Sequence, residues 1–544
     1  MTEMTGGQAL VQSLKVEGIE TIFALPGVQL DWAFDALYDE RDAIRVIHTR
    51  HEQATAYMAD GYARASGRIG TCLIVPGPGL LNASAALSTA YACSSQVLCL
   101  SWQIQSDLIG KGRGLLHEIP HQLEMLRSVT KWAARALTPA EIPGLVHEAL
   151  RQLGSGRPRP VELEVPPDVL QARGEVRLAE PEPFVRGGAG DPDLLEQAAK
   201  ALGQAKTPLI CAGGGVLLAG AWEELRRLAK LLEAPVLMTN EARGALSDRD
   251  HLALTSLAGR QVLPEADVIL AVGTRFVQPA TMWGLKPEQT VIQLDIDPEE
   301  IGRNHTPNIG IEADAKLGLT ALAERTERHN RSRSSRKDEL LAIKADCQAR
   351  LDQVEPQASY AKAIRAELPD DGIVVADSTQ VGYWSYTGFP VYEPRTFLTS
   401  GYQGTLGYAF ATSLGAQVGC PPRKVISING DGGFMYNVQE LSTMAQQGIN
   451  AVAIVFNDNA YGNVRRTQRQ QFNEHVIATE LNNPNFAELA ELFGVAGTRA
   501  TGPDGLRRAL GKALSSDEPT LIEVPVEEMP NPWLLYRPPT PPRA

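Results

Sequence analysis

The sequence predicts an α/β protein built from three doubly wound parallel-sheet domains. Short β-branched runs alternate with amphipathic segments of helix length along the whole chain, which is typical of parallel sheets joined by crossover helices. The chain has 544 residues, too many for one hydrophobic core, so about three domains are expected. Hydrophobic residues make up 43% and charged residues 21% of the chain, as in an ordinary globular protein.

The strand candidates form three successive groups, one in each third of the chain. Each candidate is a short apolar run followed by a segment of helix length. The candidates are Thr21–Leu25, Ala43–His48, Thr71–Val75, Val97–Leu100 and Val161–Val165, then Leu209–Ala212, Pro235–Met238, Val268–Val272 and Val291–Asp295, and finally Ile373–Ala376, Lys424–Ile428, Ala451–Phe456 and Thr520–Val524.

Two stretches without apolar periodicity predict the domain boundaries. The segment from Arg173 to Asp191 mixes Pro, Glu and Gly, and the segment from Glu327 to Lys337 is a polar run. Proline cannot continue a helix or a central strand, so the Pro-rich end of the chain is expected to lie extended on the surface. The predicted units are an N-terminal domain at 1–173, a central domain at 191–326, a C-terminal domain at 338–530 and the tail at 531–544.

Charge and cysteine usage exclude several classes of partner. The formal net charge is −13, which disfavours nucleic acid as the main partner. No apolar run approaches the roughly 20 residues of a membrane helix, and the N-terminus lacks the features of a secretion signal. The six cysteines are scattered without C-x-x-C spacing, so neither a disulfide framework nor a zinc site is indicated. We therefore expect a cytoplasmic protein.

Two acidic residues follow predicted strands of the C-terminal domain. Asp431 lies in Asn429–Gly433 directly after one strand, and Asp458 follows the next strand. Parallel strands present their carboxyl ends at the edge where open α/β sheets bind ligands. Glycines beside Asp431 allow a phosphate to approach, and a helix expected from about Asn437 favours negative charge. The pair predicts an Mg²⁺–diphosphate site, although a lone Gly-Asp-Gly is more often a tight turn.

The spacing from Asp431 to Asp458 resembles the thiamine diphosphate-binding signature, a Gly-Asp-Gly followed after roughly 25–30 residues by Asn. The family usually has Asn where this chain has Asp458, so an additional negative charge is expected near the diphosphate. Asn457 is the alternative ligand at this position. The resemblance implies that Asp431, Asp458 and the backbone carbonyl of Ala460 bind Mg²⁺, and that Gly430, Gly432, Gly433 and Tyr461 line the diphosphate.

A glutamate is expected to activate the cofactor. Thiamine diphosphate needs a buried carboxyl group against its pyrimidine ring, and Glu52 lies where a predicted strand ends and a helix begins. The surrounding run, Ile47 to Arg64, resembles the acetolactate synthase and pyruvate oxidase family, which carries its catalytic glutamate at this place. Without that resemblance, a first-turn Glu stabilised by the helix dipole would be the simpler interpretation.

Three further segments resemble this family. Gly77–Asn82 matches a Gly-Pro-Gly-x-x-Asn turn, and Ser400–Tyr408 resembles the segment that clamps the pyrimidine. In that segment the carbonyl of Gly404 is implied to accept from the amino group of the pyrimidine, and Leu406 to force the cofactor into a V shape, although Leu406 could equally be a core residue. Asp377–Gln380 matches a loop that contacts the diphosphate, which implies roles for Thr379 and Gln380.

The substrate pocket is predicted from fewer signals. His117 falls where relatives place a polar side chain facing the reacting centre, and its ordinary pKa suits proton transfer; His121 is a weaker candidate. The resemblance implies that Val28 and Gln29 line the pocket from a neighbouring subunit. Biosynthetic acetolactate synthases carry Trp at the position of Thr467, so the natural reaction of this chain can differ from theirs.

The central domain contains a weaker nucleotide signal. Ala212–Gly215 and Leu294–Pro298 resemble segments that hold FAD in several relatives, and the same segments persist in relatives without flavin. A Gly-rich turn after a strand is weak evidence for a nucleotide. FAD is therefore possible but not favoured.

The function implied is cleavage or formation of a C–C bond next to a carbonyl, with thiamine diphosphate and Mg²⁺ as cofactors. Decarboxylation of a 2-oxo acid with carboligation to an aldehyde or a second 2-oxo acid is favoured. A simple 2-oxo acid decarboxylase and a lyase for 2-hydroxyacyl-CoA or a cyclic dione remain alternatives. A non-catalytic cofactor-binding protein would not need Glu52, and a nicotinamide dehydrogenase would leave the acidic residues unexplained. A homodimer or homotetramer with active sites at a subunit interface is implied.

Overall fold

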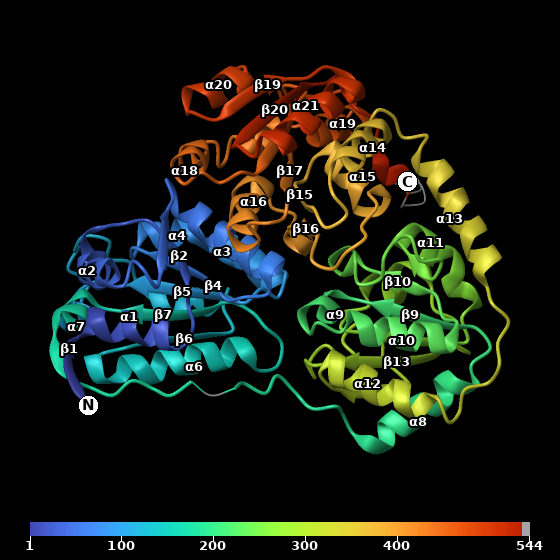
Figure 1. Cartoon of the computed structure of the whole chain (residues 1–544), viewed down its shortest axis with the longest axis horizontal. Helices are drawn as coiled ribbons and strands as arrows, with labels where there is room; N and C mark the ends of the chain where they lie inside the picture. Colours follow the sequence, from blue (N-terminus) through green and yellow to red (C-terminus); the bar gives the residue numbers. More distant parts are fainter. Residues whose placement is uncertain (182, 536–544) are drawn as a thin grey trace.

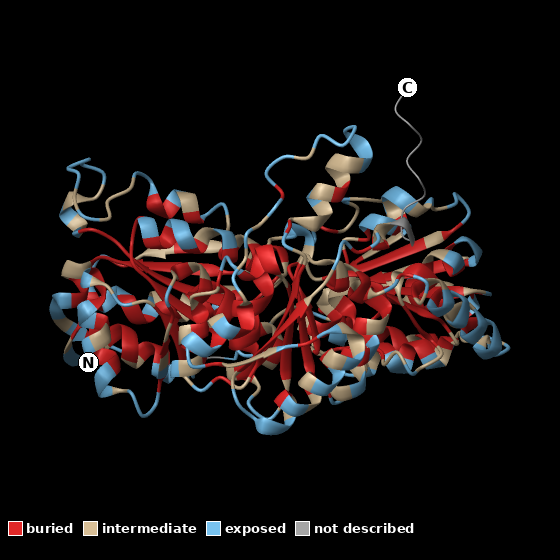
Figure 2. Ribbon diagram, turned by 90° about the horizontal axis from the view of Figure 1, so that it is seen from above, coloured by how far each residue is buried: buried red, intermediate tan, exposed pale blue. Residues whose placement is uncertain are grey.

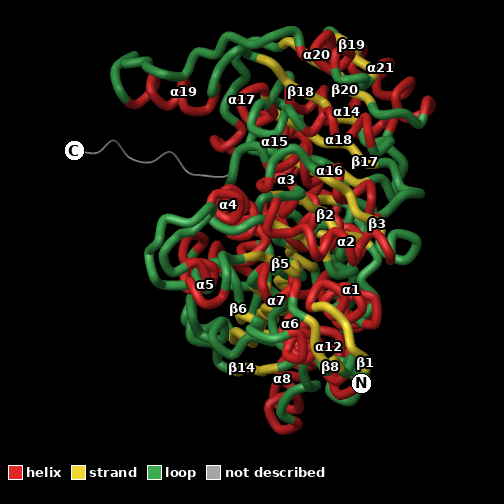
Figure 3. Tube along the Cα trace, turned by 90° about the vertical axis from the view of Figure 1, so that its left-hand side faces the viewer, coloured by secondary structure: helices red, strands yellow, loops and turns green. Residues whose placement is uncertain are grey.

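Three six-stranded parallel sheets, each covered by helices, build the molecule (Figure 1). The computed structural model describes residues 1–181 and 183–535. The N-terminal and central domains lie side by side, and the C-terminal domain contacts both of them (Figure 1). Strands form the buried interior while the outer faces of the helices are exposed (Figure 2), and helices flank the strands in the side view (Figure 3). The predicted α/β class with three parallel-sheet domains is confirmed.

The N-terminal domain has the strand order β3-β2-β4-β5-β7-β6. A separate antiparallel pair joins its first and last strands, β1 (Thr2–Thr5) and β8 (Arg173–Val176). The sheet strands are β2 (Thr21–Ala24), β3 (Arg45–His48), β4 (Gly70–Ile74), β5 (Val97–Trp102), β6 (Trp132–Arg135) and β7 (Val161–Val165), and the principal helices are α1 (Gly6–Val16), α2 (Asp31–Asp39), α3 (Glu52–Ser66), α4 (Pro78–Ala92), α5 (Gln122–Leu126) and α6 (Ile142–Gly154).

The central domain has the strand order β11-β10-β9-β12-β13-β14. Its strands are β9 (Pro208–Ala212), β10 (Val236–Met238), β11 (Ala253–Leu254), β12 (Val268–Val272), β13 (Thr290–Asp295) and β14 (Ile309–Glu312), and its helices include α8 (Pro192–Gln204), α9 (Gly214–Leu218), α10 (Trp222–Leu232), α11 (Ser256–Val262) and α12 (Ala315–Thr326).

The C-terminal domain has the strand order β16-β15-β17-β18-β20-β19. Its strands are β15 (Ile373–Ala376), β16 (Phe397–Thr399), β17 (Val425–Gly430), β18 (Val452–Asn457), β19 (Ala496–Arg499) and β20 (Thr520–Pro525), and its helices are α13 (Lys337–Leu351), α14 (Gln357–Glu367), α15 (Gln380–Gly388), α16 (Tyr408–Gly419), α17 (Asp431–Phe434), α18 (Glu440–Gln446), α19 (Gly462–Gln471), α20 (Phe486–Leu492) and α21 (Gly502–Ser516).

The strand orders place one topological switch point in each domain. In the N-terminal domain β2 and β4 are neighbours although β3 lies between them in sequence, and β15 and β17 repeat this arrangement in the C-terminal domain. In the central domain the corresponding neighbours are β9 and β12. Open α/β sheets bind ligands outside the carboxyl ends of such strands. The loops after these strands are therefore the candidate ligand sites.

Helices α3 and α16 pack the N-terminal domain against the C-terminal domain through small residues. A side chain at Gly61 would clash with the carbonyl of Thr412, and one at Gly415 would clash with the carbonyl of Met58. Both helices are almost wholly buried. Their backbones approach closely because glycine and alanine replace larger side chains, which explains the small residues that follow Glu52.

Several local predictions were wrong. Residues 173–176, placed at the start of a linker, form β8 instead, because pairing with the N-terminal segment supplies hydrogen bonds that composition alone does not reveal. A helix was expected from about Asn437, but α17 begins at Asp431 and α18 at Glu440. In the tail, Pro532–Leu535 forms one 3₁₀ turn, and residues 536–544 lie outside the described residues. Among the described helices, none has the length and apolar character needed to cross a membrane.

Candidate active site

Glu52 is the first residue of α3 and is buried, with 9% of its surface exposed. His51 caps the helix by accepting a hydrogen bond from the backbone N–H of Gln53. The Asn82 side chain donates to Glu52 Oε2 at 3.0 Å, and a Cβ at Gly79 would lie 3.1 Å from Oε1. The carboxyl group is thus held against the start of α4 in a water-poor site. A carboxyl in such a place can hydrogen-bond a ligand without competition from solvent.

The turn Gly77–Gly79 is held by Gln122, a residue that the sequence analysis did not select. The backbone N–H of Gly77 donates to Gln122 Oε1 at 2.9 Å. Gln122 Nε2 donates to the carbonyl of Trp102 and to Glu164 at 2.7 and 2.8 Å. Gln122 is 1% exposed, so its amide is fully committed to this network. No sequence signal distinguished Gln122 from its neighbour His121, which is exposed.

His117 lies on the other side of the same turn. Its backbone is left-handed, with φ of 67°, and a side chain at Gly77 would clash with its carbonyl. The ring is half-buried, and Nδ1 lies 3.0 Å from Gln29 Oε1. Val28, next to Gln29, is 65% exposed. The N-terminal domain therefore brings Glu52, His117 and Gln29 together around the ends of β2 and β4.

The two candidate metal ligands meet at the carboxyl ends of β17 and β18. Asp431 is 2% exposed and Asp458 is half-buried. Burial, together with the nearby Asp458 charge, raises the pKa of Asp431 to about 6. Burial also raises the pKa of Asp458, although Arg465, 3.7 Å from its Oδ2, opposes this. Two partly desolvated like charges destabilise each other, and a cation between them would relieve this repulsion.

The neighbouring groups engage Asn457, the alternative candidate ligand. Asn457 Nδ2 donates to Glu523 at 3.0 Å, and its Oδ1 accepts from Asn459 N and from Asn483 Nδ2. Both ends of this amide are therefore occupied. Asn483 also donates to Asp431 Oδ2 at 2.6 Å, so it orients a candidate ligand that lies 52 residues away in sequence. Because Asn483 and Asp431 are so far apart in sequence, no motif connects them, and the sequence analysis did not select Asn483.

The backbone around Ala460 also suits a metal. A bridge with Glu480 uses the N–H of Tyr461 and the carbonyl of Asn459. Within the part of the chain that the structure describes, this pattern leaves the carbonyl of Ala460 outside the bridge. The Tyr461 ring packs on Gly432, where a Cβ would come within 2.5 Å of the ring.

The other candidate cofactor residues surround Asp377, whose burial raises its pKa to about 6. Asp377 accepts hydrogen bonds from the N–H groups of Ser378 and Ala409. It therefore connects the loop after β15 to the start of α16. A Cβ at Gly433 would lie 3.2 Å from its Oδ2. The remaining candidates lie nearby. Thr379 is the N-cap residue of α15, and the Gln380 side chain accepts a hydrogen bond from Arg466. Gly404 is exposed, with its carbonyl 3.4 Å from Ser378 Oγ, and Leu406 is half-buried.

Thr467 lies on α19, which projects from the C-terminal domain beside α17 (Figure 3). Its hydroxyl donates to the carbonyl of Asn463 at 3.0 Å, and the side chain is half-buried. A short side chain that bonds its own helix leaves space where a Trp would fill the site. Arg466, one residue earlier, is buried and bonds Gln380 and the carbonyl of Met529.

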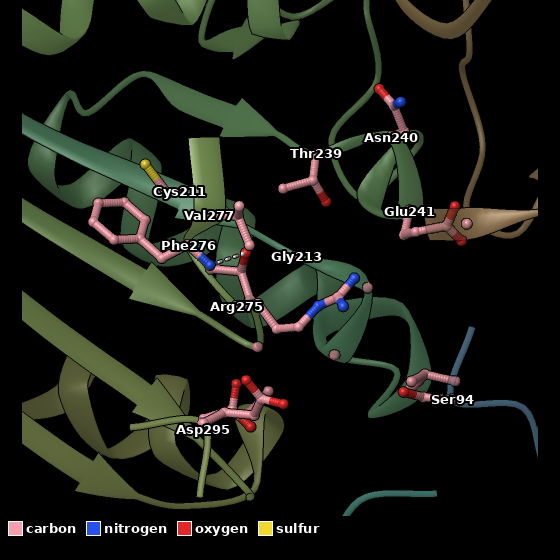
Figure 4. Close-up of a pocket in the computed structure, with 18 of the residues that line it drawn as sticks. Ser94, Cys211, Gly213, Thr239, Asn240, Glu241, Arg275, Phe276, Val277 and Asp295 are labelled. Atoms are coloured by element: carbon pink, nitrogen blue, oxygen red, sulfur yellow. Dashed lines mark hydrogen bonds between the residues drawn. The ribbon is translucent and has the colours of Figure 1, made fainter. Parts of the chain in front are cut away.

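A separate cavity of about 380 Å³ lies at the switch point of the central domain. Arg275 projects into it between Asp295 and Glu241 (Figure 4). Side chains at Gly213 or Gly215 would clash with the backbone of Gly273. The Gly-rich turn is therefore required for packing of the two loops, whether or not a nucleotide binds there.

The donor set of the C-terminal domain fits Mg²⁺ and a diphosphate. Two carboxylates and a free carbonyl are the oxygen ligands that Mg²⁺ prefers, and the adjoining glycines leave the backbone open to phosphate. Glu52 supplies the buried carboxyl group that the pyrimidine of thiamine diphosphate requires. The residues present therefore fit both groups.

The three sheets and this donor set define a class of cofactor-dependent α/β enzymes. Residues 4–125, 195–322 and 377–524 match the N-terminal, central and C-terminal domain models of thiamine pyrophosphate (thiamine diphosphate) enzymes. The chain belongs to the thiamine pyrophosphate enzyme family.

Individual relatives cover almost the whole chain. A probable acetolactate synthase large subunit of Methanocaldococcus jannaschii is 34% identical over 97% of this chain and 93% of its own length. A probable 2-ketoarginine decarboxylase of Pseudomonas aeruginosa is 34% identical over 96% and 94%. The acetolactate synthase isozyme 2 large subunit of Escherichia coli is 31% identical over 98% of both chains. The protein is thus an enzyme that depends on thiamine diphosphate.

Proposed function

We propose that the enzyme decarboxylates a 2-oxo acid and joins the remaining fragment to a second carbonyl compound, as acetolactate synthases do. The observation that carries this proposal is the position of Glu52, buried at the start of α3 and held by Asn82. Mere binding of the cofactor does not require such a carboxyl group, whereas activation of the pyrimidine does. Relatives named acetolactate synthase support the same reaction class.

Each residue has a defined task in this proposal. Asp431, Asp458 and the carbonyl of Ala460 would hold Mg²⁺, a cation that favours oxygen ligands and phosphate groups. When bound, thiamine diphosphate supplies a carbon nucleophile and an electron sink at the substrate carbonyl. Glu52 holds a hydrogen bond at the pyrimidine ring, and Asn82 fixes the orientation of its carboxyl group. His117 moves a proton to or from the substrate, because imidazole exchanges protons near neutral pH.

Simple decarboxylation is the second candidate, and Thr467 favours it. The short Thr467 side chain leaves the acceptor side of the site wider and more polar than a Trp would. One relative is named for decarboxylation of 2-ketoarginine. A lyase acting on a 2-hydroxyacyl-CoA or a cyclic dione would use the same groups around Glu52 and Asp431.

We also propose that two subunits complete each site. The contacts of the Glu52 carboxylate come from the N-terminal domain, through Asn82 and Gly79. The hydrogen bond to Asp431 comes from Asn483 of the C-terminal domain. Exposed apolar side chains lie on the loops around Glu52 and around Asp431, which is typical of an interface. These side chains are Val28, Leu81 and Leu116 beside Glu52, and Met435 and Tyr436 beside Asp431.

The remaining parts of the proposal concern flavin and location. FAD stays outside the proposed cofactor set, because packing against Gly273 already explains the Gly-rich turn. A visible absorbance spectrum of the purified protein checks this, and stoichiometric flavin would contradict it.

We propose a cytoplasmic location, which is supported by six free thiols.

Product analysis tests the proposed reaction. The enzyme with thiamine diphosphate and Mg²⁺ is given each member of a 2-oxo acid panel, with and without an aldehyde. Carboligation predicts CO₂ together with a hydroxyketone, or with a 2-hydroxy-3-oxo acid, that contains fragments of both substrates. Free aldehyde as the sole organic product would instead establish the decarboxylase. Turnover of none of these acids by the loaded enzyme would reject both.

A further inference from the structure

Gln29 joins two loops through both ends of its amide group. It lies in the 3₁₀ turn Val28–Leu30 after β2 and is 9% exposed. Its Nε2 donates to the carbonyl of Leu116 at 3.2 Å, and its Oε1 lies 3.0 Å from His117 Nδ1. The two loops are 88 residues apart in sequence. A buried polar side chain with both ends committed has a fixed orientation.

These partners determine which ring nitrogen of His117 carries the hydrogen. A backbone carbonyl can only accept, so the amide nitrogen of Gln29 must face Leu116. The amide oxygen then faces His117 and can only accept in turn. His117 Nδ1 must therefore be the donor, and the neutral ring keeps its lone pair on Nε2. This assignment follows from the hydrogen-bond network, as histidine tautomers generally do.

The backbone of His117 is also constrained. It occupies the left-handed region with φ of 67°, which is unfavourable for a residue other than glycine. The turn is closed by the N–H of Glu118, which donates to the carbonyl of Leu115, and by the N–H of Leu115, which donates to Glu118 Oε2. The Gly77 backbone packs against the His117 carbonyl. Strain that surrounding contacts maintain is typical of functional sites.

We propose that Gln29 is a positioning residue that holds His117 in its Nδ1–H tautomer, so that Nε2 serves as the proton acceptor toward the substrate. The inference rests on the proposed function, in which His117 faces the reacting 2-oxo acid. In a turnover Nε2 accepts one proton from the oxygen on the reacting carbon as its C=O bond re-forms, and it returns that proton to the carbonyl oxygen of the next substrate molecule. The Nδ1–H bond to Gln29 is kept in both charge states, so the ring does not turn during proton transfer.

The charged groups near His117 are Glu118 and Arg113 on its own loop and Glu52 across the Gly77–Gly79 turn. Glu118 is the adjacent carboxylate, and hydrogen bonds from the N–H groups of Leu115 and Arg113 hold its pKa below the usual range. It therefore stays ionised across the neutral range. Gln29, Gly77 and Leu116, which contact His117 or its turn, do not titrate.

The test compares Gln29→Leu and Gln29→Glu, with Gln105→Glu at an exposed position as the control. The assay uses the loaded enzyme with pyruvate, or with the 2-oxo acid of the panel that gives the highest turnover. Gln29→Leu should lower kcat about tenfold to a hundredfold with unchanged affinity for thiamine diphosphate. Gln29→Glu places a carboxylate beside Nδ1–H and should move the acid limb of kcat upward by about one pH unit. Gln105→Glu should change neither.

A double-mutant cycle separates this inference from the proposed function. In a His117→Ala background both changes at Gln29 should have no further effect on kcat. Full additivity would overturn the positioning role. Wild-type kcat in His117→Ala itself would instead remove His117 from the proposed mechanism.

A spectroscopic measurement keeps the inference testable if the variants fold poorly. Histidine ¹⁵N shifts of the wild-type holoenzyme distinguish the two tautomers, and His117→Ala identifies the His117 signal among nine histidines. An Nδ1–H signal in the neutral ring is expected. An Nε2–H signal would overturn the proposal.

Discussion

At the scale of single residues, Asp458 carries a charge where the family usually has an amide. Arg465 lies 3.7 Å from its Oδ2 and in turn contacts Glu528. The arginine thus offsets part of the additional negative charge beside the diphosphate site. Gly462 is required here as well, because a Cβ at that position would run into the Asp458 carboxylate. The positive charge of Arg465 and the absence of a side chain at Gly462 both accommodate the Asp458 carboxylate.

Substitutions at Asp458 test its role as a metal ligand. Asp458→Ala should lower the apparent affinity for Mg²⁺ at least tenfold, because one of two carboxylate ligands is lost. Asp458→Asn should retain much of the activity, since the amide oxygen can still bind the metal. Near-UV circular dichroism of cofactor binding at graded Mg²⁺ measures the affinity without an activity assay. The exposed Asp504→Ala is the control, and normal Mg²⁺ binding by Asp458→Ala would exclude this residue as a ligand.

Residues of the site differ in how far the sequence predicted them. Glu52 and Asp431 lie in contiguous motifs, where neighbouring residues constrain the chemistry. Gln122 and Asn483 act through remote partners, Gly77 and Asp431 respectively. A single amide has no local pattern that marks it as a support for another loop. These two therefore emerged only from the folded chain.

At the scale of elements, the Gly77–Gly79 turn connects the two candidate catalytic residues. One end abuts the carbonyl of His117, and the other end packs against Glu52. Gly77 has φ of 60° and ψ of −115°, a conformation essentially limited to glycine. A displacement of this turn would move both sides of the site together.

Gly77→Ala is expected to disable the site. The new methyl group would meet the carbonyl of His117, so kcat should fall by roughly a hundredfold or more through misplacement of the catalytic groups. Gly448→Ala is a matched control, because Gly448 has φ of 58° and open space around its Cα. It should cost about 1 kcal/mol of stability with nearly normal kcat. Rates and melting temperatures of both variants check this, and equal losses of kcat would contradict it.

Edge strands mark where element prediction failed. Five of them, β6, β11, β14, β16 and β19, were not predicted, and each is the outermost strand of its sheet. Inner strands are buried on both faces and read as continuous apolar runs. The residues of β14 and β19 are mostly partly exposed, and β11 has two residues. Composition did not separate such segments from loops.

At the scale of the whole molecule, Glu440 joins the C-terminal domain to the loop that carries Glu52. Both of its oxygens accept from the N–H of Arg50, at 3.1 and 3.2 Å, and Thr443 bonds it as well. Burial raises the pKa of Glu440 from 4.5 to about 7. The contact therefore stabilises the domain arrangement in a pH-dependent way.

The sign of that dependence follows from linkage. Above about pH 4.5 the unfolded chain loses the Glu440 proton while the folded chain keeps it up to about pH 7. The free energy of unfolding should fall across this window by at most about 3 kcal/mol. Glu440→Gln should remove that part of the fall, whereas the exposed Glu491→Gln should keep it. Melting temperatures across this pH range measure the difference, and parallel curves for wild type and Glu440→Gln would contradict it.

Subunit mixing tests the proposed shared sites. Glu52→Gln and Asp431→Ala chains should each be inactive alone. In a mixed dimer one site carries both lesions and the other carries none, so activity should return to about half the wild-type rate per mixed dimer. Two tags of different size verify that subunits have exchanged. Verified exchange without recovery would place Glu52 and Asp431 in a site within one chain.

The sequence by itself determined the three α/β domains and the family, and it predicted the cofactor roles of Glu52 and Asp431. These properties depend on periodicity and on contiguous motifs, which local backbone geometry enforces. Tertiary structure alone decided that Gln29 contacts His117, that Gln122 bonds the Gly77 turn, and that the Asn457 amide is bonded to Glu523. The physical reason is that a hydrogen bond acts over about 3 Å of space, irrespective of how many residues separate its partners along the chain.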